Sequence, residues 1–114
     1  MLGRHSILEC YGCDPDVLKS QDQLEKLLVD SAVKANATVL HSYFHKFDQG
    51  QGITGVIALA ESHISVHTWP EYGYMAVDVF MCGDCNPEVS INYIIEKLDI
   101  KAHSLSTLQR GNFY

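Results

Sequence analysis

The sequence has 114 residues, of which 46% are hydrophobic and 19% charged, and this is the composition of a single soluble globular domain, residues 1–114. No run approaches the roughly 20 apolar residues that span a bilayer, and residues 1–5 lack the apolar core of a signal peptide. We therefore expect a cytoplasmic protein that does not associate with membranes. The net charge of −6, without any cluster of basic residues, argues against binding to nucleic acid.

The first part of the chain predicts a strand and a helix. Residues 6–11 read as a short strand, which the turn-prone residues 14–16 follow. A helix is expected over residues 20–35, because Ser20 and Gln23 have the spacing of a capping box and leucines and alanines then recur at helical intervals.

The middle of the chain predicts strands joined by hairpins. Residues 38–47 are β-branched and aromatic, and the glycine-rich loop 48–52 follows them. Residues 53–60 form a nearly continuous apolar run, which predicts a strand buried on both faces. Residues 63–68 alternate, which places His63, Ser65 and His67 on one side of a strand and Ile64 and Val66 on the other.

The last part predicts a turn at 69–73 and a second alternating strand at 74–82. Asn86 and Pro87 begin a helix that runs to about residue 98 and buries Val89, Ile91, Ile94, Ile95 and Leu98. A strand at 100–106 and a tail complete the chain. The element order predicts an α+β two-layer sandwich, with a mainly antiparallel sheet and two helices on one face.

The four cysteines form two C-x-x-C pairs, Cys10/Cys13 and Cys82/Cys85, which is formally the pattern of a four-thiolate zinc site. Zinc sites of this kind usually place the second pair roughly 15–20 residues on, whereas here residues 14–81 intervene. A zinc-binding module without enzymatic activity is therefore the weaker alternative. Cys10 and Cys13 are better interpreted as small buried hydrophobic residues.

Histidines and serines in the segment 61–67 indicate chemistry of another kind. His63 and His67 are four residues apart, which on a strand separates them by about 13 Å, so no metal site is expected there. The G-x-S-x-G elbow of hydrolases is absent. Ser62, however, lies at a corner between two strands, where its Oγ can attack the carbonyl of Glu61 while a nearby imidazole moves protons.

The segment AESHISVHTWPEYGY (60–74), followed by VDVFMCG (77–83), closely resembles the prokaryotic S-adenosylmethionine decarboxylases. The resemblance extends to LGRH (2–5), YGCD (11–14) and FHKF (44–47), and so covers most of the chain. The C-terminal third matches mainly in pattern.

This resemblance implies an enzyme that makes its own pyruvoyl cofactor from Ser62. Cleavage between Glu61 and Ser62 would give a β chain, residues 1–61, and an α chain, residues 62–114. The pyruvoyl group would form a Schiff base with the amine of S-adenosylmethionine and take up the electrons released on decarboxylation. The product would be the aminopropyl donor of spermidine biosynthesis.

The resemblance also implies roles for individual residues. Cys82 matches the proton donor, and His67 matches the histidine that removes the α-proton of the ester during processing. Thr54 stands where many members carry a processing serine, and its hydroxyl can make the same hydrogen bond.

Three further residues would bind the substrate. Phe47 matches the aromatic residue that stacks on adenine, Glu71 matches a substrate-binding carboxylate, and Trp69 is a candidate wall of the same pocket. Related pyruvoyl enzymes act on arginine or ornithine, and the processing motif does not separate these substrates. The resemblance finally implies an (αβ)₂ homodimer, in which two sheets pack face to face as an αββα sandwich.

Overall fold

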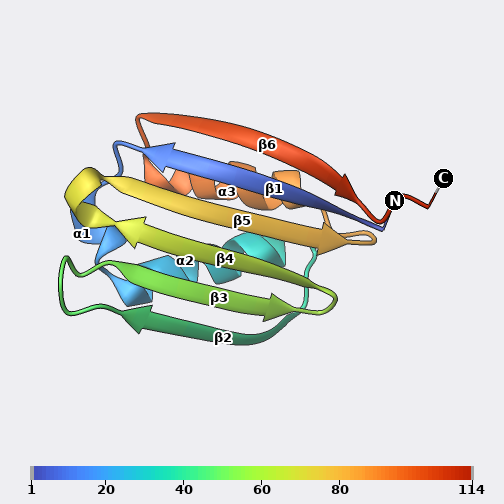
Figure 1. Cartoon of the computed structure of the whole chain (residues 1–114). Helices are drawn as coiled ribbons and strands as arrows, with labels where there is room; N and C mark the ends of the chain where they lie inside the picture. The colour runs from blue at the N-terminus through green and yellow to red at the C-terminus, as the bar shows by residue number, and fades with distance from the viewer. Residues whose placement is uncertain (1, 114) are drawn as a thin grey trace.

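The computed structural model describes residues 2–113 and contains one six-stranded antiparallel sheet with the strand order β2-β3-β4-β5-β1-β6. All the helices lie on one face of this sheet, and the opposite face is uncovered (Figure 1). Within residues 2–113, no helix is long and apolar enough to cross a membrane. The elements are β1 (Gly3–Tyr11), α1 (Pro15–Leu18), α2 (Gln21–Lys34), β2 (Val39–Lys46), β3 (Ile53–Leu59), β4 (Ser62–Trp69), η1 (Pro70–Tyr72), β5 (Tyr74–Cys82), α3 (Pro87–Leu98) and β6 (Ala102–Arg110).

The predicted α+β sandwich is confirmed, with one extra helix. Residues 14–16, expected to form a turn, instead begin α1. The Asp14 carboxylate accepts a hydrogen bond from the amide of Asp16 at 2.9 Å, and Pro15 occupies the first helical turn. An N-terminal carboxylate cap and a proline with preset φ are enough to begin a helix.

The prediction that residues 53–60 are buried on both faces is wrong. Ile53 and Ile57 point to the helices and are buried, whereas the side chain of Val56 points to the uncovered face and is 44% exposed. Only one helical layer is present, so the other apolar side of β3 faces outward. Val89, which was expected to be on the buried face of α3, is also exposed.

The last strand is longer than expected. β6 pairs with β1 from Ala102 opposite Tyr11 to Arg110 opposite Gly3, so the first part of the predicted tail belongs to the sheet. Every residue of β6 is exposed, because the helices do not extend under this edge.

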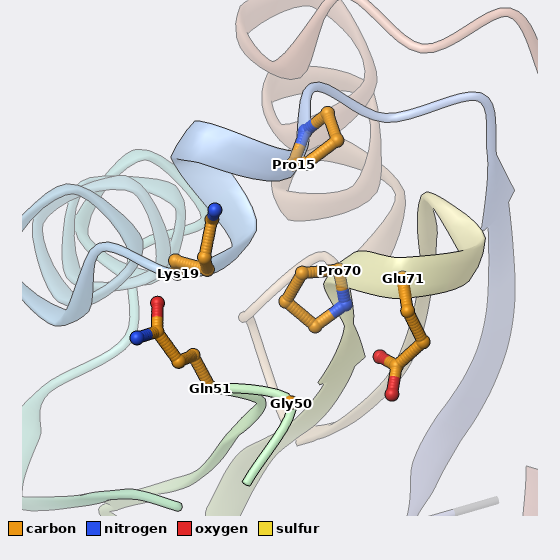
Figure 2. Close-up of a pocket in the computed structure, with 6 residues that line it drawn as sticks. All are labelled: Pro15, Lys19, Gly50, Gln51, Pro70 and Glu71. Atoms are coloured by element: carbon orange, nitrogen blue, oxygen red, sulfur yellow. The ribbon is translucent and has the colours of Figure 1, made fainter. Parts of the chain in front are cut away.

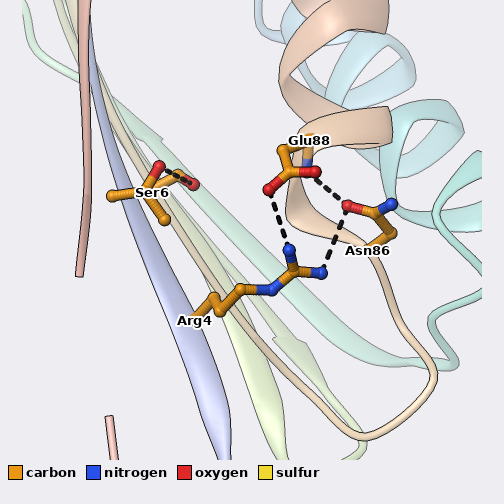
Figure 3. A network of polar contacts seen from close by, with 5 residues as sticks. Arg4, Ser6, Asn86 and Glu88 are labelled. Atoms are coloured by element: carbon orange, nitrogen blue, oxygen red, sulfur yellow. Dashed lines mark hydrogen bonds and ion pairs between the residues drawn. The ribbon is translucent and has the colours of Figure 1, made fainter. Parts of the chain in front are cut away.

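The N-terminus of α3 is anchored to β1. The side chain of Asn86 accepts a hydrogen bond from the amide of Glu88 at 2.9 Å, as the sequence predicted for a cap. Arg4 donates to the Glu88 carboxylate at 2.8 Å and to Asn86 at 3.4 Å (Figure 3). These contacts hold the segment that leads from β5 into α3.

Candidate active site

The Glu61–Ser62 peptide bond lies at the tight turn between β3 and β4. Leu59 pairs with Ser62, so only Ala60 and Glu61 form the turn. Glu61 has a φ of +61°. A non-glycine residue in the left-handed region carries about 1–3 kcal/mol of strain, and here it lies directly before the predicted cleavage point.

The hydroxyl of Ser62 is held next to the end of β5. Its Oγ accepts a hydrogen bond from the backbone amide of Cys82 at 3.2 Å. A hydroxyl that accepts a bond keeps its own proton and a second lone pair. Ser62 and Cys82 therefore lie at the same end of the sheet, which we call the cleavage end.

A cavity of about 480 Å³ opens at the cleavage end and is lined by Leu2, Glu61, Cys82 and Gly83. Gly3 keeps the space beside Cys82 free, since a Cβ at residue 3 would lie 3.0 Å from the Cys82 Sγ and 2.8 Å from the carbonyl oxygen of Met81. Gly3 was not among the predicted site residues. The signal in the sequence was a glycine inside a strand, which often marks a close backbone approach.

The predicted processing histidine lies towards the other end of the same strand. The Nδ1 of His67 is 3.0 Å from the Oγ1 of Thr54, and these two residues are directly paired across β3 and β4. The structure thus brings together Thr54 and His67, two of the residues predicted to take part in processing.

The three predicted substrate-binding residues gather beyond His67. Phe47, Trp69 and Glu71 line a cavity of about 200 Å³ together with Gln49, Gly52 and Thr68. The indole of Trp69 stacks on Tyr74 with 5.2 Å between ring centroids. With Thr54 and His67, these three residues form what we call the distal end of the site.

Glu71 also borders a second, more open hollow of about 510 Å³ between α1, the loop 48–52 and η1. There the Glu71 carboxylate and the Lys19 ammonium point away from one another (Figure 2). This hollow holds none of the other predicted site residues. All three predicted substrate-binding residues meet instead in the cavity on the side of Phe47 and Trp69.

The two ends are not brought together within one chain. Ser62 and His67 are five residues apart on β4, which corresponds to about 16 Å along an extended strand. Proton transfer needs a direct hydrogen bond or one bridging water. His67 therefore does not reach the Ser62 of its own chain.

The uncovered face between the two ends carries perturbed ionisable groups. Burial, and then the neighbouring His5 imidazole, lowers the pKa of His63, while Asp78 acts in the opposite direction. Burial, and then the hydrogen bond that its hydroxyl donates to Glu9 at 2.6 Å, raises the pKa of Tyr74 to about 12. Tyr74 is thus a neutral hydrogen-bond donor near neutrality.

Comparison with known proteins decides the family. The model of the S-adenosylmethionine decarboxylase family matches residues 4–111. The chain belongs to the S-adenosylmethionine decarboxylase family. Relatives named S-adenosylmethionine decarboxylase proenzyme include one from Clostridium kluyveri, 51% identical over 98% of this chain and 89% of the relative. Another, from Thermodesulfovibrio yellowstonii, is 47% identical over 96% of this chain and 82% of the relative.

A solved structure agrees with this family assignment. The crystal structure of the adenosylmethionine decarboxylase from Aquifex aeolicus is similar with a TM-score of 0.89 and 37% sequence identity. The similarity covers 99% of this chain and 93% of that one. The fold of this member of the S-adenosylmethionine decarboxylase family is therefore that of a solved relative over nearly its whole length.

The zinc alternative is not supported in this member of the family. Gly3 pairs with Cys82 and Cys10 pairs with Met75, so the two C-x-x-C pairs lie at opposite ends of the sheet. Seven residues of strand separate them by about 23 Å, and no metal ion bridges that distance. Burial raises the pKa of the Cys10 thiol to about 12 and that of Cys13 to about 11, as expected of buried structural cysteines.

Proposed function

We propose that this protein is a self-cleaving, pyruvoyl-dependent decarboxylase of S-adenosylmethionine. The observation that carries the proposal is the geometry of the cleavage end. There a strained Glu61 precedes Ser62, whose hydroxyl accepts the amide of Cys82 and keeps its proton available. The relatives' name, proenzyme, agrees with an inactive precursor that processes itself. The decarboxylated product would serve as the aminopropyl donor of spermidine biosynthesis.

Self-cleavage would begin with attack of the Ser62 Oγ on the Glu61 carbonyl carbon. The peptide nitrogen leaves as a free amine and the bond between Glu61 and Ser62 becomes an ester. A base then removes the α-proton of residue 62, and the main-chain carboxylate of Glu61 departs as the new C-terminus of the β chain. One water releases ammonia from the resulting dehydroalanine, and the new α chain begins with a pyruvoyl group.

The residues at the cleavage end fit this cofactor. Space for a substrate beside Glu61 and Cys82 exists in the cavity of about 480 Å³, and Gly3 keeps the Cys82 thiol free of side-chain contact on that side. When formed, the pyruvoyl group supplies an electron sink for decarboxylation. Cys82 is the acid that returns a proton to the substrate's α-carbon, since a thiol is a serviceable general acid near neutrality.

The distal end suits an adenosyl group. Phe47 and Trp69 are both partly exposed, at 48% and 39%, so their ring faces are available to an adenine or to a sulfonium cation. The Glu71 carboxylate in the same cavity can accept hydrogen bonds from ribose hydroxyls. Arginine and ornithine offer no aromatic ring for this pocket, so the geometry favours S-adenosylmethionine.

We propose further that two copies of the chain form the site. The uncovered sheet face exposes apolar side chains from five of the six strands: Ile7, Tyr11, Tyr43, Val56, Trp69 and Leu108. An antiparallel sheet with one bare apolar face is expected to pack against another layer. Two such faces together would form the αββα sandwich, and the exposed apolar side of β3 would then be buried.

A two-fold axis that crosses the strands would place the cleavage end of one subunit over the distal end of the other. Facing sheets lie about 10 Å apart, and side chains from both bridge that distance. The base that acts on Ser62 would then be the partner subunit's His67, positioned by its hydrogen bond with Thr54. This arrangement accounts for the separation of about 16 Å along one strand.

The test is intact mass measurement of the purified protein, followed by carbon dioxide release from S-adenosylmethionine, arginine and ornithine, each labelled in the carboxyl group. We expect two chains, residues 1–61 and 62–114, with the second starting in a pyruvoyl group, and release from S-adenosylmethionine alone. A single intact chain would contradict self-cleavage. Cleaved protein that acts on arginine or ornithine would support the pyruvoyl cofactor but contradict S-adenosylmethionine as the substrate.

A further inference from the structure

The second C-x-x-C pair differs from the first in its surroundings. Cys10 and Cys13 are buried in the core, with exposures of 0% and 4%. Cys82 and Cys85 are each partly exposed and free. The proposed function uses Cys82 and leaves Cys85 without a role.

A tight turn joins Cys82 to Cys85. The amide of Cys85 donates to the carbonyl oxygen of Cys82 at 3.3 Å, and Gly83 supplies the positive φ of +62° inside the turn. A turn closed in this way keeps its first and fourth Cα atoms within about 7 Å. Disulfides need Cα atoms about 4.4–6.8 Å apart, so this turn already supplies the required backbone approach.

The turn has room to adjust. A Cβ placed at Gly83 would meet no atom within 4 Å, so neighbouring groups do not pack against that residue. The Cys85 thiol donates a weak hydrogen bond to the carbonyl oxygen of Asn36 at 3.2 Å, and its side chain packs partly against the core. Rotation of the Cys85 side chain towards Cys82 breaks this weak hydrogen bond and gives up part of that packing.

The two thiols line different, adjoining hollows. Cys82 lines the cavity of about 480 Å³ at the cleavage end. Cys85 lines a hollow of about 130 Å³ that shares Leu2 and Gly83 with this cavity but does not include Cys82. A small oxidant therefore reaches Cys85 without entering the substrate cavity.

We propose that Cys82 and Cys85 form a redox-active dithiol, which a low-molecular-weight disulfide such as oxidised glutathione converts into an intramolecular disulfide. The Cys85 thiolate attacks one sulfur of oxidised glutathione and releases one reduced glutathione. The Cys82 thiolate then attacks the Cys85 sulfur and releases the second. The two thiols give up two protons and two electrons, and the oxidant becomes two molecules of reduced glutathione.

The consequence for activity rests on the proposed function, because it requires Cys82 to be the proton donor. A sulfur in a disulfide carries no proton to give. Oxidised enzyme should therefore fall to the activity of the Cys82→Ala variant, and dithiothreitol should restore it. Self-cleaved protein is used throughout, so that processing does not enter the measurement.

The experiment equilibrates the protein with oxidised and reduced glutathione, stops exchange with acid, and maps the thiols by mass after digestion with trypsin. Lysines and arginines separate the pairs, since Cys10 and Cys13 fall in residues 5–19, and Cys82 and Cys85 in residues 62–97 of the α chain. We expect the second peptide to become two hydrogen atoms lighter, and the first to remain reduced. Cys85→Ser is the matched control, and its peptide should take up glutathione or stay reduced but never become lighter.

Glutathione adducts on Cys82 and Cys85 without the internal bond would overturn the proposal, as would oxidation of the buried pair alone. An internal disulfide that leaves decarboxylation unchanged would overturn the effect on activity. Because the mapping needs no substrate, a protein inactive on S-adenosylmethionine still gives a decisive result for the disulfide. The experiment therefore distinguishes failure of the proposed function from failure of the proposed disulfide.

Discussion

The cleavage end and the distal end of the sheet carry different groups, and the proposed reaction needs both. At the cleavage end are a strained peptide bond, a serine hydroxyl and a thiol, and the imidazole of His67 lies out of reach. At the distal end are a histidine oriented by a threonine, two aromatic rings and a carboxylate, with no bond to cleave. Each end is chemically incomplete, and the length of β4 keeps them apart.

This division teaches how a short chain can build an enclosed site. A domain of 114 residues hides only about two-thirds of its unfolded surface, so it has little depth in which to bury reacting groups. In the proposed dimer, half a site at each end of a bare sheet face would let a second copy supply both the missing half and the cover. Such a two-fold dimer would contain two complete sites.

The strongest test of this division is complementation between two inactive variants. Ser62→Ala should give a single uncleaved chain with no activity, and His67→Ala should stall processing before or at the ester. Co-expressed with different tags, they should form mixed dimers in which only the His67→Ala chain is cleaved. Random pairing would restore about a quarter of the wild-type number of sites.

Two controls make the complementation decisive. Ser62→Ala mixed with Cys82→Ala should show no decarboxylation beyond the residual rate of Cys82→Ala itself, because both changes affect the cleavage end and no mixed site contains both groups. Treatment of stalled His67→Ala with hydroxylamine should cleave the chain if the ester has formed. Mixed dimers without cleavage, or normal processing of His67→Ala alone, would show that the site does not form across the interface.

Removal of the thiol should separate cleavage from catalysis. Cys82→Ala should still self-cleave, because its backbone amide continues to donate to Ser62. Its turnover should fall about 10²- to 10⁴-fold, the usual contribution of a general acid, or divert to transamination of the cofactor. Steady-state rates per cleaved chain measure this, and full activity would remove Cys82 from the mechanism.

Much of this arrangement follows from local sequence. Caps at Ser20 and Asn86, the alternation of β4 and β5, and the corner at Glu61 were predictable because each depends on neighbouring residues. A two-residue turn at Ala60 and Glu61 also sets the pairing of Thr54 with His67 by counting outward from the turn. The same counting shows that Ser62 and His67 are separated.

The remaining features depend on contacts between distant segments. Gly3 approaches Cys82 because β1 pairs with β5, a strand far away in the sequence. No local sequence pattern encodes such a distant neighbour. The apolar run of β3 predicted burial on both faces, but the chain has only one helical layer. An apolar run indicates that both faces of a strand are to be buried, but it does not tell whether the same chain or a second chain covers them.

A smaller effect is expected from the hydroxyl that orients His67. Thr54→Val keeps the shape of the side chain but removes the hydrogen bond to Nδ1. One such bond contributes about 1 kcal/mol, so self-cleavage should slow roughly 5-fold. Thr54→Ser should restore the rate, and equal rates in Thr54→Val and wild type would show that the bond does not orient the base.

The smallest expected effect concerns His63, which lies on the uncovered face one row inward from the cleavage end. His5, Asp78 and Arg110 are the ionisable groups that affect it, and burial is the largest cause of its lowered pKa. Because the unfolded chain takes up the proton first, His63 leaves stability unchanged well above pH 6.5 and reduces it as the pH falls below that value. The reduction ends once the pH is below the lowered pKa.

Urea unfolding of wild type and His63→Gln at pH 7.5 and 5.5 should show that the free energy of unfolding falls more in wild type. His41→Gln, on an edge strand, is the control. An equal loss in all three would mean that His63 is as easily protonated in the folded protein as in the unfolded chain.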